Sequence, residues 1–268
     1  MMDYVAPTTL DDAYRALAAE DARCLAGGQS LVAMMNLGLV SPARLVSLRR
    51  IDALRGIAAQ PDGALRLGAM TTHAEIAALD VASAGASLLA QAARVVAYPA
   101  VRAWGTIGGS VAHADPAADY PVALVAAQAT IETGSASGGR RIAARDFFRG
   151  LFETALAPGE IVIAVHVPAG PPGGRARYEK LSVVAGDFAI LSVAAIVAET
   201  AQVAIGGCAP TPLFAMAIAL SDTALLAAGQ ELARQSNPPD DHRTSPQYRR
   251  RVLPELLRRT VRAAQELS

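Results

Sequence analysis

The stretch Gly105-Thr106-Ile107-Gly108-Gly109-Ser110 decides how the rest of the chain is interpreted. Two adjacent glycines lie between a β-branched pair and a hydroxyl, and small residues then lead to an acid at Asp119. Adjacent glycines let a backbone turn sharply and approach a ligand without a Cβ in the way. Successive N–H groups in such a turn form a concave anion site. The motif therefore predicts a turn that binds a phosphate.

A second stretch of the same character lies upstream, at Ala26-Gly27-Gly28-Gln29-Ser30-Leu31. It follows an apolar strand predicted over 23–26 and precedes a helix predicted over 31–37. That order gathers backbone N–H groups at one spot. One glycine pair alone is a weak signal, but two pairs, each followed by a hydroxyl and apolar residues, favour a diphosphate site. We expect the two turns to face each other across one phosphate-bearing cofactor.

Composition excludes several classes of protein. The chain has 268 residues, of which 52% are hydrophobic and 18% charged, enough for one large domain or two to three small ones. Zero net charge and 4% aromatic residues argue against nucleic-acid binding. No apolar run reaches the roughly 18 residues of a membrane span, and the first residues do not resemble a signal peptide. A cytoplasmic protein is expected.

The other reactive residues give no constellation of their own. Cys24 and Cys208 stand alone, which is typical of small buried side chains rather than of an iron–sulfur cluster or a zinc site. The four histidines share no spacing, and only His113 lies next to the central motif. Asp115 and Asp119 are four apart and could share a helix face, or Asp115 could cap a turn beside Pro116. No dinucleotide, P-loop or nucleophile-elbow motif occurs.

The order of predicted elements changes once along the chain. Before the glycine- and proline-rich linker over 169–174, helices alternate with strands, and a capping box at Thr72 and Glu75 starts one helix. The predicted elements of this part are strands over 3–7, 44–48, 56–59, 64–68, 129–132, 140–143 and 160–167, helices over 88–96 and 121–127, and a loose turn over 134–139. After the linker we expect antiparallel strands over 176–182, 190–197 and 202–205, and helices from 221 to 236 and from 245 onward, the last kinked at Pro254.

Taken together, these residues resemble the FAD-binding medium subunit of molybdenum hydroxylases, the group of carbon monoxide dehydrogenase and xanthine dehydrogenase. The resemblance covers nearly the whole chain in order and is highly specific. Besides the two glycine motifs it rests on the stretches at 112–119, 158–160, 178–180, 186–189, 206–212 and 241–249. Two departures lie in the C-terminal part: Leu213-Phe214 stand where the family often has an arginine, and the segment between Val197 and Val203 is short.

The resemblance implies an α+β fold. It consists of an FAD-binding domain of the vanillyl-alcohol-oxidase (PCMH) type in two subdomains, followed by a C-terminal α+β domain with an antiparallel sheet. The implied boundaries are 1–57 and 58–169 for the two FAD-binding subdomains, and 175–268 for the C-terminal domain.

The resemblance also implies non-covalent FAD, with its diphosphate between the two glycine loops. Asp119 matches an acid that binds the nucleotide portion, Lys180 a basic residue near the flavin ring, and Phe188 a residue that covers the isoalloxazine. Ile161 to Ile163 match an apolar strand close to the cofactor. The implied binding residues are Leu25, Ala26, Gly27, Gly28, Gln29, Ser30, Leu31, Thr106, Ile107, Gly108, Gly109, Ser110, Asp119, Ile163, Lys180 and Phe188, with no catalytic acid or base and no metal ligand.

The function implied is electron transfer within a larger enzyme. A molybdopterin-binding large subunit oxidises the substrate, a small subunit carries electrons through [2Fe–2S] clusters, and FAD in this chain passes them to NAD, a quinone or another acceptor. The assembly implied is a dimer of heterotrimers. Two alternatives remain open: a stand-alone FAD-dependent oxidoreductase of the same fold, and a non-catalytic assembly subunit.

Overall fold

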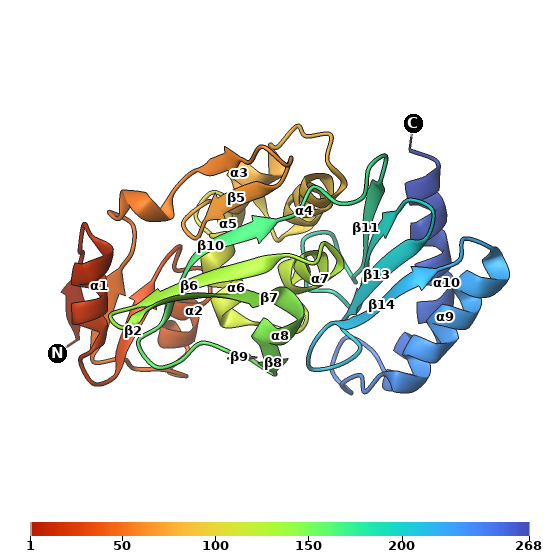
Figure 1. The fold of residues 1–268 in the computed structure, drawn as a ribbon. Coiled ribbons are helices and arrows are strands. Elements are labelled where there is room, and N and C mark those ends of the chain that lie inside the picture. The colour runs from red at the N-terminus through yellow and green to blue at the C-terminus, as the bar shows by residue number, and fades with distance from the viewer. Residues whose placement is uncertain (1, 268) are drawn as a thin grey trace.

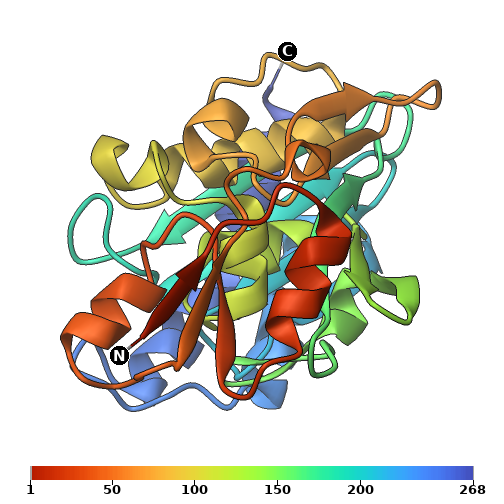
Figure 2. The ribbon, with the colours of Figure 1, turned by 90° about the vertical axis from the view of Figure 1, so that its left-hand side faces the viewer.

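A three-stranded parallel sheet forms the N-terminal part of the computed structural model, which describes residues 2–267 (Figure 1). Its order is β1 (Asp3–Val5), β3 (Arg44–Ser47), β2 (Ala22–Leu25). Figure 2 looks onto this sheet, with α1 (Leu10–Leu17) and α2 (Leu31–Asn36) on either side of the strands in that view. Since β2 and β3 are parallel, their carboxyl ends meet at one edge, and the segments that follow them lie side by side.

The second sheet is antiparallel and has the order β4 (Ile57–Ala59), β5 (Leu65–Gly68), β10 (Ile161–Val167), β6 (Thr130–Ser135), β7 (Gly138–Ala143). A hairpin with Asp62-Gly63 in its turn joins β4 to β5. The loose turn predicted over 134–139 is wrong, because Ser135 pairs with Gly138 and leaves a two-residue turn. Gly138 makes this possible with a backbone φ of 123°.

The remaining elements before the C-terminal part are short helices and a small hairpin, and the hairpin was not predicted from the sequence. The capping box at Thr72 is confirmed, and the helix predicted over 88–96 begins earlier, at Ala84. The elements are η1 (Asp52–Leu54), α3 (His73–Ala77), α4 (Ala84–Val95), α5 (Pro99–Arg102), α6 (Ile107–His113), α7 (Asp119–Ala126), α8 (Ala144–Phe147), β8 (Phe148–Gly150) and β9 (Glu153–Thr154).

Asp115 and Asp119 do not share a helix face. The Asp115 carboxylate accepts a hydrogen bond from the backbone N–H of Ala117 at 2.8 Å, in the turn between α6 and α7. Asp119 is the first residue of α7. Pro116 follows Asp115 directly and disfavours helical backbone there. The turn role for Asp115 is the one the structure confirms.

The C-terminal part is a four-stranded antiparallel sheet in the order β11 (Arg175–Leu181), β12 (Leu191–Val197), β13 (Ala201–Gly206), β14 (Leu213–Ile218). Every residue of β12 is buried. Figure 1 shows the reason: α4 and α7 cover one face of the sheet, while α9 (Asp222–Gln235) and α10 (Pro246–Gln265) cover the other. Gly229 of α9 lets the last two helices approach, since a Cβ there would lie 2.5 Å from the Cα of Pro254.

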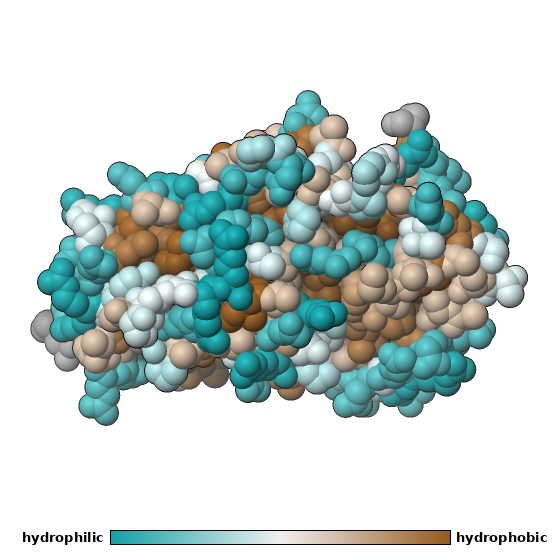
Figure 3. Space-filling model, in the orientation of Figure 1, coloured by the Kyte–Doolittle hydropathy of each residue, from teal (hydrophilic) through white to brown (hydrophobic). Residues whose placement is uncertain are grey.

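Strand β14 was not predicted, and it forms an edge of its sheet. It begins with Leu213-Phe214, which stand where the family often has an arginine, and its exposed residues include Met216. Figure 3 shows this side of the C-terminal sheet as a broad apolar area bordered by polar side chains. In the part of the chain from 2 to 267, no helix is both long and apolar enough to cross a membrane.

Candidate functional site

The first glycine motif is an open loop at the carboxyl edge of the parallel sheet. It connects Leu25, at the end of β2, to Leu31, at the start of α2, and Gly28 takes a left-handed φ of 75°. Within residues 2–267, the backbone N–H groups of Gly27, Gly28, Gln29, Ser30 and Leu31 donate to no protein acceptor. Five consecutive free donors are what a multivalent anion requires.

The second glycine motif has a different geometry from the one its sequence predicts. It forms the first turn of α6, with Thr106 as the N-cap. Its four N–H groups are all used: Ile107 donates to Thr71 O at 3.0 Å, Gly108 to Ala69 O at 2.9 Å, Gly109 to Thr106 Oγ1 at 3.2 Å and Ser110 to Thr106 O at 3.0 Å. The prediction of a sharp turn with open donors is therefore wrong here, because the threonine cap starts a helix instead.

The glycines of this region serve close approach between segments. A Cβ on Gly108 would lie 2.5 Å from the Cβ of Ala69, and one on Gly27 would lie 2.1 Å from the carbonyl oxygen of Trp104. A Cβ on Gly109 would lie 3.6 Å from that of Ala26. Real Cβ atoms do not approach backbone this closely, so glycine is required at 27 and 108. The contacts bring the two motifs against each other.

Asp119 and Lys180 are brought into direct contact. Lys180 Nζ lies 3.1 Å from Asp119 Oδ2 and donates to Val95 O at 2.7 Å, while Tyr178 Oη donates to Asp119 Oδ1 at 2.8 Å. The side chains of Lys180 and Asp119 are only 5% and 7% exposed. Burial raises the pKa of Asp119, and the neighbouring Lys180 charge and the hydrogen bonds from Tyr178 and Lys180 partly offset it. The two residues that the resemblance assigns to different parts of FAD thus form one buried pair.

Phe188 and Ile163 lie in contrasting surroundings. Phe188 is 47% exposed, in the turn after β11, and the guanidinium of Arg243 lies 5.6 Å from its ring centre. Ile163 is buried in β10, where its carbonyl accepts from the N–H of Ala69 at 2.9 Å. Ala69 is also the residue that packs against Gly108, so β10 supports the second motif from behind.

His73 is a buried residue that the sequence gave no reason to place here. Its backbone N–H donates to Gly105 O at 2.9 Å, and its ring Nδ1 lies 3.0 Å from the hydroxyl oxygen of Tyr120. Burial, together with the positive charge of Arg102, lowers the pKa of His73 to about 4. The imidazole is therefore neutral near pH 7 and supports the segment that leads into the second motif. Tyr120 is 47 positions away, so no local pattern could have found the pair.

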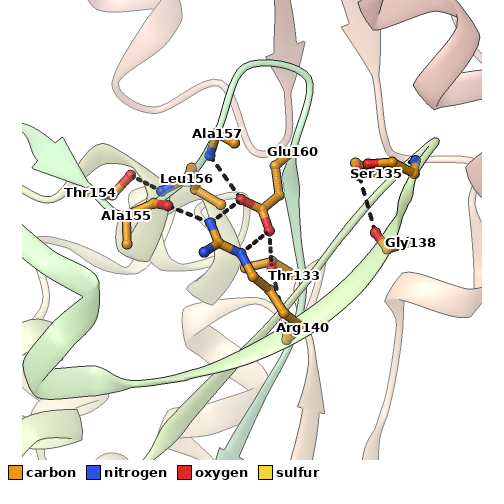
Figure 4. Close-up of polar contacts among 10 residues, drawn as sticks. Thr133, Ser135, Gly138, Arg140, Thr154, Ala155, Leu156, Ala157 and Glu160 are labelled. Atoms are coloured by element: carbon orange, nitrogen blue, oxygen red, sulfur yellow. Dashed lines mark hydrogen bonds and ion pairs between the residues drawn. The ribbon is translucent and has the colours of Figure 1, made fainter.

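Glu160, in the stretch 158–160, holds the second sheet together. Figure 4 shows its carboxylate between the guanidinium of Arg140, at 2.7 and 2.8 Å, the N–H of Ala157 at 2.8 Å and the hydroxyl of Thr133. Hydrogen bonding to Arg140 is the main reason that the pKa of Glu160 falls to about 2. The stretch is thus a structural anchor between the β6–β7 hairpin and β10.

Two distant stretches of the C-terminal part meet at Arg249. This side chain is 1% exposed, and it donates to Gly207 O at 2.7 Å and to Asp241 Oδ1 at 2.8 Å. Gly207 has a left-handed φ of 77°, which turns its carbonyl toward the guanidinium. These contacts hold together the two stretches at 206–212 and 241–249, on which the family resemblance partly rests.

Comparison with known proteins identifies the family. The description "FAD binding domain in molybdopterin dehydrogenase" matches residues 1–170, and "CO dehydrogenase flavoprotein C-terminal domain" matches residues 176–264. The chain is an FAD-binding medium subunit of the molybdenum hydroxylase family. The resemblance and the α+β fold expected from the sequence are thereby confirmed.

Relatives in this family match along almost their full length. The glyceraldehyde dehydrogenase medium chain of Sulfolobus acidocaldarius is 36% identical, over 99% of this chain and 98% of its own. The carbon monoxide dehydrogenase medium chain of Afipia carboxidovorans is 34% identical, over 98% and 96%.

Solved structures of related enzymes contain chains with the same fold. A crystal structure of the Cu,Mo-CO dehydrogenase matches with a TM-score of 0.92 and 34% identity, over 98% of this chain and 97% of that one. Quinoline 2-oxidoreductase from Pseudomonas putida 86 matches with a TM-score of 0.90 and 29% identity, over 98% and 96%. The chain is therefore an FAD subunit of an oxidoreductase.

The residues present fit FAD. The free donors from Gly27 to Leu31 suit a diphosphate, and Gly109 leaves the facing wall without a side chain. Within residues 2–267, no group of three or more histidine, cysteine or acidic side chains is arranged to hold a metal ion.

Proposed function

We propose that this chain holds FAD in a fixed place within a larger molybdenum hydroxylase and lets electrons pass through it. The observation that carries the proposal is the row of five open N–H groups from Gly27 to Leu31, set against the glycine wall of α6. These N–H groups are free to donate hydrogen bonds to the oxygens of a diphosphate. Such a site suits tight but non-covalent binding.

The proposed site combines an anion cradle with apolar and charged walls. Its residues are Leu25, Ala26, Gly27, Gly28, Gln29, Ser30 and Leu31 in the first motif, Thr106, Ile107, Gly108, Gly109 and Ser110 in the second, and Asp119, Ile163, Lys180 and Phe188 around them. When bound, FAD supplies the exchange of one or two electrons with other redox groups. The chain's own residues bind and orient it: the free N–H groups hold the diphosphate, and Phe188, on an exposed turn, shields one face of the ring from water.

The buried Lys180–Asp119 pair supports a positioning role. Lys180 donates hydrogen bonds to Val95 O and to Asp119, and these bonds fix the position of its ammonium group. No side chain of this site is required to donate or accept a proton as a catalyst.

We also propose three structural units, 1–57, 58–169 and 175–268. Each carries its own β-sheet, the parallel sheet with β1, the antiparallel sheet with β10 and the sheet with β12. The contact between the first and second glycine motifs then lies between the first two units.

The proposed partners are a molybdopterin-binding large subunit and a small subunit with two [2Fe–2S] clusters, in a dimer of heterotrimers. Electrons taken from the substrate in the large subunit pass through the clusters to FAD here, and then to NAD, a quinone or another acceptor. The relatives support this because they are named as medium chains of enzymes for substrates as different as glyceraldehyde and carbon monoxide. One fold shared by such enzymes is expected if the substrate is bound elsewhere. A cytoplasmic location remains a prediction.

The test is to purify the chain alone and with its co-expressed neighbours. We expect a yellow protein whose flavin is released by acid, at one FAD per chain, and whose reduction by substrate requires the partner subunits. A colourless protein that cannot be reconstituted with FAD would contradict FAD binding. Substrate oxidation by the isolated chain would instead favour a stand-alone flavin oxidoreductase.

A further inference from the structure

Arg49 is an exposed arginine at the same sheet edge as the first glycine motif. It follows β3 just as the motif follows β2, and the two segments are joined by a hydrogen bond from Leu48 N–H to Leu25 O at 2.9 Å. The central carbon of its guanidinium lies over the ring of Trp104, 4.4 Å from the ring centre. Trp104 in turn touches the motif, since its carbonyl is the atom against which Gly27 packs.

Among residues 2–267, the ring of Trp104 is the partner of the Arg49 guanidinium. Within residues 2–267 it forms no ion pair, and its N–H groups have no hydrogen-bond acceptor. Arg44, on the strand just before it, shows the contrast, because it pairs with Asp3 at 2.7 Å. The backbone of Arg49 is also held, since Arg55 donates to its carbonyl.

Stacking on an aromatic ring uses the face of a guanidinium and leaves its edge free. The N–H groups lie in the plane of the group and match two phosphate oxygens at once. The ring thus orients an unpaired cation beside a loop whose free donors suit a diphosphate but carry no formal charge.

We propose that Arg49, held by Trp104, binds the diphosphate of FAD together with the first glycine motif. The proposal rests on the proposed function, because it requires FAD in that loop. Arg49 supplies the positive charge that the N–H groups lack, and Trp104 acts as its positioning residue. The ligand class is an organic diphosphate, and the adenosine end of FAD carries the same group as ADP.

The test uses the full chain after FAD removal, titrated with FAD and with ADP at low and high salt. Arg49→Met should weaken the binding of both ligands by about 10- to 100-fold at low salt, and the difference should shrink at high salt. The matched control is Arg50→Met, which removes the same charge from the next residue and should bind within about twofold of wild type. Trp104→Leu should cost about 2- to 5-fold, and Arg49→Met should then have less effect.

A second measurement does not depend on activity. Trp104 is the one tryptophan of the chain, so its emission reports on the ring beside Arg49. ADP should shift this emission in wild type and in Arg50→Met, and much less in Arg49→Met. Equal affinity and an equal shift in Arg49→Met, or an equal loss in Arg50→Met, would overturn the assignment of Arg49 while leaving FAD binding in place. A wild-type chain that binds neither ligand would overturn the proposed function and this inference together.

Discussion

Lys180 Nζ lies 3.1 Å from Asp119 Oδ2, and this buried ion pair joins a strand of the C-terminal sheet to a helix of the FAD-binding part. The same contact region contains Gln91 of α4, whose amide donates to Ala176 O at 2.8 Å and accepts from the N–H of Tyr178 at 3.0 Å. The Gln91 amide thus forms the two backbone hydrogen bonds with β11 that a neighbouring strand would form. Position and charge at the proposed flavin site therefore depend on how the two parts of the chain dock.

Removing one partner of the pair is expected to destabilise the chain strongly. Lys180→Met leaves a buried carboxylate without its counter-charge, which costs about 3–5 kcal/mol in buried pairs. The double variant Asp119→Asn/Lys180→Met should be less destabilised than the sum of the two single variants, because no charge is then left unpaired. Urea unfolding measures each variant. Arg175→Met, at the exposed start of the same strand, is the control and should cost less than about 1 kcal/mol; wild-type stability in Lys180→Met would contradict the pair's importance.

The folded chain should lose stability as the pH is lowered, because His73 must then take up a proton in a buried place. Burial lowers its pKa to about 4 in the folded chain, from 6.5 when exposed. A depressed pKa means that protonation favours unfolding. The stabilisation is therefore complete above pH 6.5 and is lost as the pH falls toward 4, by about 3 kcal/mol in total. His73→Gln should flatten this part of the profile of unfolding free energy against pH, whereas His242→Gln, at an exposed histidine, should not. Identical slopes in wild type and His73→Gln would refute this account.

The two glycines of α6 should respond differently to alanine. A Cβ on Gly108 would lie 2.7 Å from Ala69 O. Gly108→Ala should therefore lower the melting temperature, with an overpacking cost of about 1–3 kcal/mol. Gly109→Ala should keep the fold, since its Cβ meets only Thr106 Oγ1 at 3.0 Å and Ala26 at 3.6 Å. It adds a methyl group where the two motifs meet, so FAD affinity should fall by about tenfold or more. Unchanged FAD content in Gly109→Ala would move the diphosphate elsewhere.

Gly28 and Gly38 form a matched pair for the first motif. Both have left-handed backbones, with φ of 75° and 70°, and they flank the same helix. Alanine at either position carries a strain of about 1–2 kcal/mol, so the two variants should lose similar thermal stability. Only Gly28→Ala changes the loop with the free donors, and only it should release FAD on gel filtration. Equal retention of FAD in both variants would count against the loop.

Much of the fold followed from local patterns in the sequence. Thr72 starts its helix through a capping box with Glu75, which depends on hydrogen bonds within a few residues. The glycine- and proline-rich linker over 169–174 precedes the four-stranded sheet of the C-terminal part. Strand β14 was missed, since a strand at a sheet edge is defined by its pairing with β13 rather than by its own pattern. The α6 glycines were misjudged because a glycine pair fits a turn and a tightly packed helix equally well.

The sequence by itself determined the family, the FAD cofactor and much of the order of the elements, because glycine spacing, capping residues and linkers are encoded in consecutive residues. Only the tertiary structure decided which donors remain free. It closed the N–H groups of Ile107–Ser110 through bonds to Thr71, Ala69 and Thr106, and left those of Gly27–Leu31 open. It also paired Lys180 with Asp119 and placed Arg49 on Trp104. Such contacts join residues dozens of positions apart, and no local pattern encodes them.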